Sequence, residues 1–120
     1  MASIVLAEDD STMVGLLSTL LRMDGYEVTA VDGDSDVLHT VEDVNPDALL
    51  LDMLFAQHNG LELVERIRRS NVGEKLYIIM MSGLSVREDC LRRGADDFLQ
   101  KPFMPDELTR LLRAHIPAAA

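Results

Sequence analysis

The sequence predicts an α/β fold with a single, doubly wound, five-stranded parallel sheet and helices on both faces. Short apolar runs that suit buried parallel strands alternate about five times with stretches whose apolar residues have helical spacing. Several of these runs end directly in acidic or polar residues, as strands do at the edge of a sheet. The chain has 120 residues, of which 48% are hydrophobic, so it can form one domain with one substantial core.

The chain opens with a strand, a helix and a second strand. Residues 4–7 are apolar and stop at three acids, which indicates a first buried strand. A helix should follow, with Ser11 as its N-cap and Gly25 at its end. Apolar and polar residues alternate over 26–30, which is typical of an edge strand with one wetter face. The buried stripe of the helix is expected to comprise Met13, Leu16, Leu17, Leu20 and Leu21.

A second helix and a third strand come next. A turn at residues 32–34 precedes a helical stripe over 37–44, which Pro46 ends because proline cannot continue a helix. Residues 47–52 are an apolar run too short for a helix of its own. They should form a buried strand that delivers Asp52 to its carboxyl end, where ligand sites of open α/β sheets lie.

The second half of the chain repeats the alternation. An irregular loop over residues 53–59 leads to Gly60 and a third helix, which should end near residues 71–73. Residues 76–81 form the longest apolar run and are expected to be a central strand. The remaining elements are a short helix around residues 86–91 that Gly94 stops, a strand over 96–100, and a last helix that starts at Pro105 and buries Leu108, Leu111, Leu112 and Ile116.

Composition restricts the possible partners. The chain has 11 Lys and Arg residues against 21 Asp and Glu residues, which gives a formal net charge of -10. Such a charge disfavours direct binding to nucleic acid or to an anionic membrane and favours a cation. Cys90 is the single cysteine, so no internal disulfide can form, and it is expected to be a small packing residue. No apolar run approaches the roughly 18 residues of a membrane span, so we expect a cytoplasmic protein without signal peptide or anchor.

Polar side chains follow four of the five expected strands. Glu8 and Asp9 come after the first strand, Asp52 after the third, Ser82 after the fourth and Lys101 after the fifth. In a parallel sheet these ends share one edge, so the side chains should meet there. Two carboxylates about 5 Å apart at an effective dielectric near 20 repel by roughly 3 kcal/mol, so either one carboxyl takes a proton or a cation enters. Oxygen ligands favour Mg²⁺, with Mn²⁺ as a substitute, and no His or Cys cluster suggests zinc.

The same residue types suit phosphoryl transfer. One oxygen of Asp52 can attack a phosphorus atom while a cation offsets the charge on the phosphoryl oxygens. The hydroxyl of Ser82 and the ammonium of Lys101 can bind those oxygens. We therefore expect the reversible formation of an aspartyl phosphate.

These residues resemble the receiver domain of two-component response regulators. The resemblance rests on Glu8-Asp9, Asp52, Ser82-Gly83 and Lys101-Pro102-Phe103 in this order, and it covers residues 1–120. Residues 8–13 look especially similar to chemotaxis-type, stand-alone receivers. The resemblance implies the flavodoxin-like strand order 2-1-3-4-5, with residues 117–120 as a tail or linker stump.

The family pattern implies roles for named residues. Asp52 would take the phosphoryl group from a phosphohistidine of a sensor histidine kinase or phosphotransfer protein. The implied Mg²⁺ ligands are Glu8, Asp9, Asp52 and the backbone carbonyl of Leu54, and the amides of Leu54 and Gly83 would contact the phosphoryl group. The bond between Lys101 and Pro102 would be cis.

A switch is also implied. Ser82 would move toward the phosphoryl group, and Phe98 would rotate from an exposed to an inward position. The surface of the fourth helix, last strand and last helix would thereby change for a downstream protein target or for an output domain beyond Ala120. Such a domain is not an enzyme in the usual sense, although it would carry intrinsic phosphotransfer and weak autophosphatase activity.

The chain also departs from the family pattern. Ala56 and Asn59 stand where a proline and an aspartate are usual. Leu54 and Leu84, each two residues beyond a site residue, are apolar where some members carry polar groups that position hydrolytic water. This difference leads to the hypothesis of slow self-dephosphorylation.

Other residues and functions have plainer interpretations. His39, His115 and the loop residue His58 are expected to be surface residues, and Arg66, Arg68 and Arg69 a solvated helix face. A haloacid-dehalogenase-type phosphohydrolase needs a second aspartate where Leu54 stands, and the first loop of a flavodoxin-like electron carrier could not hold phosphate beside Glu8 and Asp9. The alternative that remains is a non-phosphorylated pseudo-receiver that acts as a protein-interaction module.

Overall fold

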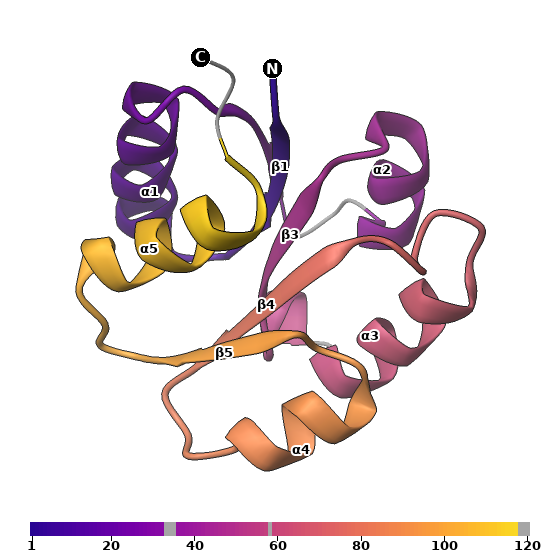
Figure 1. Ribbon diagram of the computed structural model, residues 1–120. Helices are drawn as coiled ribbons and strands as arrows, with labels where there is room; N and C mark the ends of the chain where they lie inside the picture. The colour runs from indigo at the N-terminus through magenta and orange to yellow at the C-terminus, as the bar shows by residue number, and fades with distance from the viewer. Residues whose placement is uncertain (33–35, 58, 118–120) are drawn as a thin grey trace.

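The computed structural model describes residues 1–32, 36–57 and 59–117, and its five strands form one parallel sheet (Figure 1). The strand order β2-β1-β3-β4-β5 confirms the predicted order 2-1-3-4-5. Residues 33 and 34 of the predicted turn, the loop residue His58 and residues 118–120 of the tail lie outside the described residues. The strands are β1 (Ser3–Ala7), β2 (Glu27–Val31), β3 (Ala48–Asp52), β4 (Tyr77–Ser82) and β5 (Asp97–Gln100).

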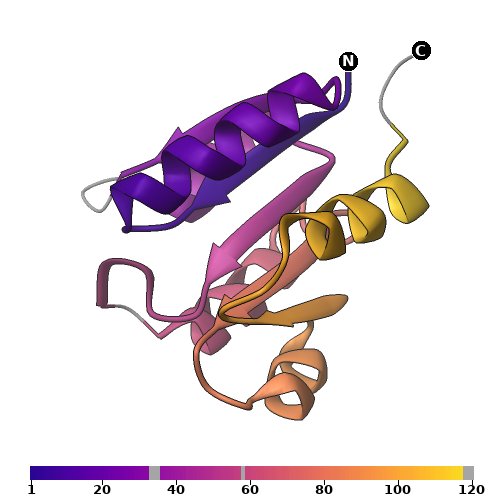
Figure 2. The same cartoon turned by 90° about the vertical axis from the view of Figure 1, so that its left-hand side faces the viewer.

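Helices cover both faces of the sheet, as predicted. Figures 1 and 2 show α1 and α5 on one face, and α2, α3 and α4 on the other. The helices are α1 (Ser11–Met23), α2 (Val37–Val44), α3 (Gly60–Arg69), α4 (Arg87–Arg93) and α5 (Pro105–His115), and a short 3-10 helix, η1 (Phe55–Gln57), lies in the loop that was expected to be irregular.

The central strands are buried on both faces, which explains why they appear as unbroken apolar runs. In β3, Leu49 and Leu51 face the cluster under α2, α3 and α4, whereas Ala48 and Leu50 face the cluster under α1 and α5. All four residues have no solvent exposure. Since both faces are covered, polar side chains of these strands can reach solvent only at the strand ends. Cys90 is fully buried in the first cluster, consistent with a packing role.

Two details of the first helix differ from the prediction. Asp10, and not Ser11, is the N-cap, because its carboxylate accepts the amides of Thr12 at 2.9 Å and Met13 at 3.2 Å. Aspartate caps helices as well as serine does, and here it stands one residue earlier. Leu16 is 52% exposed and does not join the buried stripe, because it lies about 100° around the helix from the buried Leu17.

Strand β2 lies at the edge of the sheet, as predicted, but its apolar side is only partly covered. Val28 packs against the cluster under α1 and α5, whereas Ala30 is exposed. Val31, which was not assigned to the strand, is its last residue and is buried on the opposite face.

No helix in the described part of the chain is long and apolar enough to cross a bilayer.

Arg68 is a correction to the predicted solvated face of α3. Its guanidinium donates to the carbonyls of Gly94 at 2.8 Å, Gly73 at 2.7 Å and Leu76 at 2.6 Å. It also pairs with the carboxylate of Asp96 at 2.7 Å. These acceptors are mostly backbone groups, so the sequence carries no signal for them. Arg68 therefore joins the end of α3 to the segments that flank β4 and α4.

We expect Arg68→Ala to lower the free energy of unfolding by about 2 kcal/mol, because three carbonyls and one carboxylate lose a charged donor. The matched control is Arg69→Ala, which removes the same charge from an exposed position of the same helix and should change stability by less than about 0.5 kcal/mol. Urea unfolding followed by circular dichroism measures both. Equal losses in the two variants would contradict this structural role.

Candidate functional site

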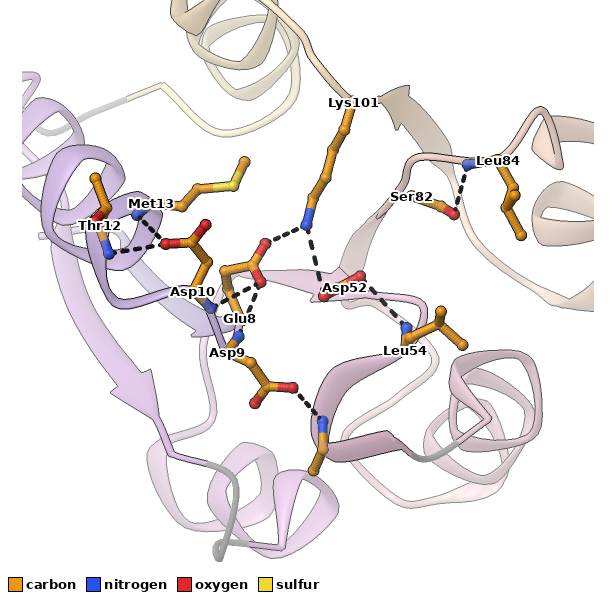
Figure 3. A network of polar contacts seen from close by, with 11 residues as sticks. Glu8, Asp9, Asp10, Thr12, Met13, Asp52, Leu54, Ser82, Leu84 and Lys101 are labelled. Carbon is orange, nitrogen blue, oxygen red and sulfur yellow. Dashed lines mark hydrogen bonds and ion pairs between the residues drawn. The ribbon is translucent and has the colours of Figure 1, made fainter.

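Polar residues from four strands meet at the carboxyl edge of the sheet, as predicted. Asp52 and Ser82 are the last residues of β3 and β4, while Glu8 and Lys101 directly follow β1 and β5. The parallel register aligns these ends, since Asp52 is the partner of Met81 and Ser82 is the partner of Gln100. Figure 3 shows that Glu8, Asp52 and Lys101 point toward one another.

Glu8 is a buried acid with every carboxylate oxygen engaged. Only 4% of the residue is exposed. Its Oε2 accepts the amides of Asp9 at 2.8 Å and Asp10 at 3.2 Å, which fixes the side chain against the start of α1. Its Oε1 lies 2.5 Å from the Nζ of Lys101. A buried carboxylate is stable only with such partners.

Lys101 bridges the buried Glu8 and the partly exposed Asp52. Its Nζ lies 2.5 Å from Glu8 and 3.5 Å from the Oδ2 of Asp52. Burial alone would lower the pKa of the ammonium, but hydrogen bonding to Glu8 and the charge of Asp52 outweigh it, so the pKa is raised. The peptide bond between Lys101 and Pro102 is cis, as the family pattern implies. Lys101 is therefore a permanent positive charge at the centre of the site.

Asp52 is half-buried, and its carboxyl holds a proton more tightly than usual. Burial raises its pKa first, and the charge of Glu8 raises it further, while Lys101 and the amide of Leu54 act in the opposite direction. The Leu54 amide donates to the Oδ1 of Asp52 at 3.3 Å. The folded site thus disfavours the negative charge of Asp52.

Asp9 does not join Glu8 and Asp52. Its Oδ2 accepts the backbone N–H of Ala56 at 2.7 Å, and Figure 3 shows its carboxylate directed away from Lys101. Ala56 lies in η1 and has a positive φ of 54°. Sequence reasoning missed this contact, because an amide donor exists at almost every residue and leaves no mark in the residue pattern.

The donor atoms suit Mg²⁺, although the side chains are not gathered as ligands. The predicted set of Glu8, Asp9, Asp52 and the Leu54 carbonyl consists of oxygen donors, the type that Mg²⁺ prefers. Glu8 and Asp52 lie on either side of the Lys101 ammonium. Among residues 1–32, 36–57 and 59–117, however, no group of three His, Cys, Asp or Glu side chains could hold a metal ion. The oxygen donors fit the ion chemically, but in this structure Asp9 is bound to the Ala56 amide and is not grouped with the other acids.

The segment after Asp52 is closed by a tight contact at its far end. The amide of Gly60 donates to the carbonyl of Met53 at 2.7 Å. A Cβ at Gly60 would lie 2.6 Å from that carbonyl oxygen, so only glycine fits without a shift of the backbone. Phe55, between these two points, is 3% exposed and packs into the cluster under α2, α3 and α4.

The predicted switch residues lie differently from the expected arrangement. Ser82 is 3% exposed, and its Oγ accepts the amide of Leu84 at 3.0 Å (Figure 3). Phe98 is 6% exposed and belongs to the cluster under α2, α3 and α4. The expected outward position of Phe98 is therefore wrong for this structure, in which the ring already fills the core beside β4. Gly83 follows Ser82 in open space, with nothing within 4 Å of a built Cβ.

Known proteins share this fold and sequence pattern. The family model of the response regulator receiver domain matches residues 4–113. The DNA-binding response regulator MtrA of Mycolicibacterium paratuberculosis is 30% identical over 116 residues, which cover 94% of this chain and 50% of that protein. The chain thus spans about half the length of such relatives.

Solved structures agree with the family match. One is the receiver domain of the sensor histidine kinase PA1611 of Pseudomonas aeruginosa, described with a magnesium ion in its active-site cleft. It is 34% identical with a TM-score of 0.83, and the match covers 96% of this chain and 97% of that one. The chemotaxis response regulator CheY4 of Vibrio cholerae shares the fold, with a TM-score of 0.86 at 24% identity over 97% of this chain and 99% of that one.

We expect Asp52→Asn to raise the free energy of unfolding at pH 7.5 by on the order of 1 kcal/mol. The folded state raises the pKa of Asp52, so ionisation of this carboxyl destabilises the fold. The gain should grow as the pH rises through the raised pKa and vanish below the ordinary pKa of 3.8. Urea unfolding of both proteins at pH 3.5 and pH 7.5 measures the difference.

The exposed acid Asp43 on α2 provides the matched control. Asp43→Asn should change stability by less than about 0.5 kcal/mol at either pH. An Asp52→Asn variant that is less stable than the wild type at pH 7.5 would show that the pairing of Asp52 with Lys101 outweighs its burial.

Proposed function

This chain belongs to the response regulator receiver domain family, and from that membership we propose that Asp52 accepts a phosphoryl group. The donor is a phosphohistidine of a sensor histidine kinase or a phosphotransfer protein. In the transfer the P–N bond of the donor breaks, a P–O bond to Asp52 forms, and the imidazole leaves. The proposal rests mainly on one observation, the Lys101 ammonium that lies 2.5 Å from Glu8 and 3.5 Å from Asp52.

Each residue of the site has a task in this proposal. Lys101 keeps its proton, so it can exchange part of its pairing with Asp52 for a phosphoryl oxygen. Ser82 can donate its hydroxyl hydrogen to another of these oxygens, while the amides of Leu54 and Gly83 supply further donors. When bound by Glu8, Asp9, Asp52 and the Leu54 carbonyl, Mg²⁺ would offset charge on the transferred group, and Mn²⁺ could replace it.

The output surface in this proposal is formed by α4, β5 and α5. Hollows flank β5 on both sides, and Arg87 and Phe98 line both of them. A move of Ser82 toward a phosphoryl group would disturb its hydrogen bond with Leu84, which lies in the loop to α4. We therefore place the response in that loop and in the surface beside Phe98, available to a downstream protein or to an output domain beyond Ala120.

Direct binding to DNA is not part of the proposal. The name of MtrA describes a protein about twice as long, and this chain has a net charge of -10 that would repel phosphates. The same charge disfavours anionic membranes, and a cytoplasmic location would suit a partner kinase that uses phosphohistidine. Any DNA contact would thus belong to an output domain.

A non-phosphorylated pseudo-receiver remains the second candidate. One observation favours it, namely that Asp9 is bound to the Ala56 amide and not grouped with the other acids. Such a protein would use the surface of α4, β5 and α5 to bind a partner without any chemistry at Asp52. The two candidates differ in whether Asp52 can be labelled.

We expect acetyl phosphate with Mg²⁺ to phosphorylate the wild-type chain and to leave Asp52→Asn unlabelled, because the acyl phosphate needs that carboxylate. Intact-protein mass spectrometry detects the adduct, and chelation of the metal should prevent it. Asp43→Asn, which removes an exposed acid from α2, should be labelled like the wild type. Absence of label on the wild type would favour the pseudo-receiver.

The phosphoryl group should also be lost slowly, because Leu54 and Leu84 offer no polar group to position water. The amides of Leu54 and Leu84 contact Asp52 and Ser82, and the two side chains are 57% and 55% exposed. We expect Leu54→Asn to accelerate loss of the acyl phosphate by roughly three- to tenfold, a modest share of what general acid–base assistance supplies.

Decay of the label in the absence of donor measures this rate. The matched control is Leu16→Asn, which changes a leucine of α1 with 52% exposure away from the site. Unchanged or slower loss in Leu54→Asn would contradict the explanation.

A further inference from the structure

The geometry points to Ala56 as a positioning residue whose backbone N–H holds Asp9 out of the metal site, so that metal binding must break this contact. This inference rests on the proposed function, because it concerns the same acidic site. Its basis is the 2.7 Å hydrogen bond from the Ala56 amide to the Oδ2 of Asp9. The two residues lie 47 positions apart in the sequence, so the contact ties the end of β1 to the segment after β3.

The carboxylate of Asp9 can bind either the Ala56 amide or a cation. In the structure its carboxylate accepts the Ala56 amide. Among the described residues, no group of three His, Cys, Asp or Glu side chains could hold a metal ion. Glu8 and Asp52, in contrast, already face the Lys101 ammonium. Asp9 is therefore the acid whose position decides whether the oxygen set is complete. Its turn from the amide to a cation exchanges one charge-assisted contact for another.

The backbone at Ala56 makes the contact adjustable. A φ of 54° lies in the left-handed region, which is unfavourable for alanine and favourable for glycine. The Ala56 amide points at Asp9 in this left-handed conformation. Residue 56 therefore sets the balance between the closed state, in which Asp9 is bound to the amide, and the open state, in which Asp9 is free.

Three substitutions at this one position separate the amide from the loop conformation. Ala56→Gly keeps the N–H and favours a positive φ, so it should strengthen the closed state and weaken Mg²⁺ binding by at least twofold. Ala56→Val keeps the N–H but disfavours that φ, whereas Ala56→Pro excludes that φ and removes the N–H. Both should tighten Mg²⁺ binding by about three- to tenfold, since the lost contact no longer competes.

A merely structural role of the loop would give the opposite order. If residue 56 only kept the segment after Asp52 in place, valine and proline would disturb the nearby Leu54 and weaken metal binding. Calorimetric titration with Mg²⁺ alone, repeated with Mn²⁺ by electron paramagnetic resonance, measures the affinities. Amide spectra of each variant verify that it is folded.

The amide of Ala56 itself provides a second readout. In ¹⁵N-labelled wild type, Mg²⁺ should shift this resonance and increase its hydrogen exchange, because the amide loses its acceptor. Asp9→Ala, which removes the acceptor, should have the same effect without metal. The inference is overturned if the resonance and exchange of this amide are unchanged at saturating Mg²⁺, or if the three variants bind Mg²⁺ with equal affinity or in the reverse order.

The same experiments distinguish failure of the proposed function from failure of the positioning role. If the wild type and every Ala56 variant neither bind Mg²⁺ nor become labelled at Asp52, both proposals are overturned. If the wild type binds Mg²⁺ and is labelled while the Ala56 variants behave alike, only the positioning role is lost. Metal binding that appears in Ala56→Pro but not in the wild type would support the positioning role strongly.

Discussion

The site depends on one positive charge placed between the buried Glu8 and the partly exposed Asp52. Lys101 satisfies Glu8, which has almost no access to water, and reaches Asp52 from the opposite side. Without that ammonium, two carboxylates would share a poorly solvated space at the edge of the sheet. The cation also connects the strand ends, since Glu8 follows β1, Asp52 ends β3 and Lys101 follows β5. The strand order therefore determines which charged residues meet at the edge of the sheet.

Two-sided burial explains why the chemistry lies where it does. Residues such as Leu49 and Leu50 point to opposite faces and meet separate helical layers, so the middle of the sheet has no position for a hydrated side chain. Only where the strands stop do the layers separate enough for polar groups. The long apolar runs that stabilise the domain thereby determine the location of its acids.

Much of the fold follows from patterns that depend on side chains alone. Apolar runs identify the central strands, and the residues after them identify Glu8, Asp52, Ser82 and Lys101. Sequence reasoning could not predict contacts made to backbone groups, nor which of two neighbouring residues would cap a helix. The carbonyls around Arg68, the amide that attracts Asp9 and the choice between Asp10 and Ser11 as N-cap all depend on atoms that every residue possesses. The inward position of Phe98 depends on how well a ring fills the core, which only coordinates reveal.

The contact between Met53 and Gly60 has a consequence for how this protein family can diversify. Because the contact fixes both ends of the intervening segment, an exposed residue within it, such as Leu54, can be exchanged while Asp52 and the start of α3 stay in register. The segment thus has two fixed ends that do not depend on its exposed side chains. Such a position can vary without a change to the core, whereas Phe55 cannot, because its ring is buried.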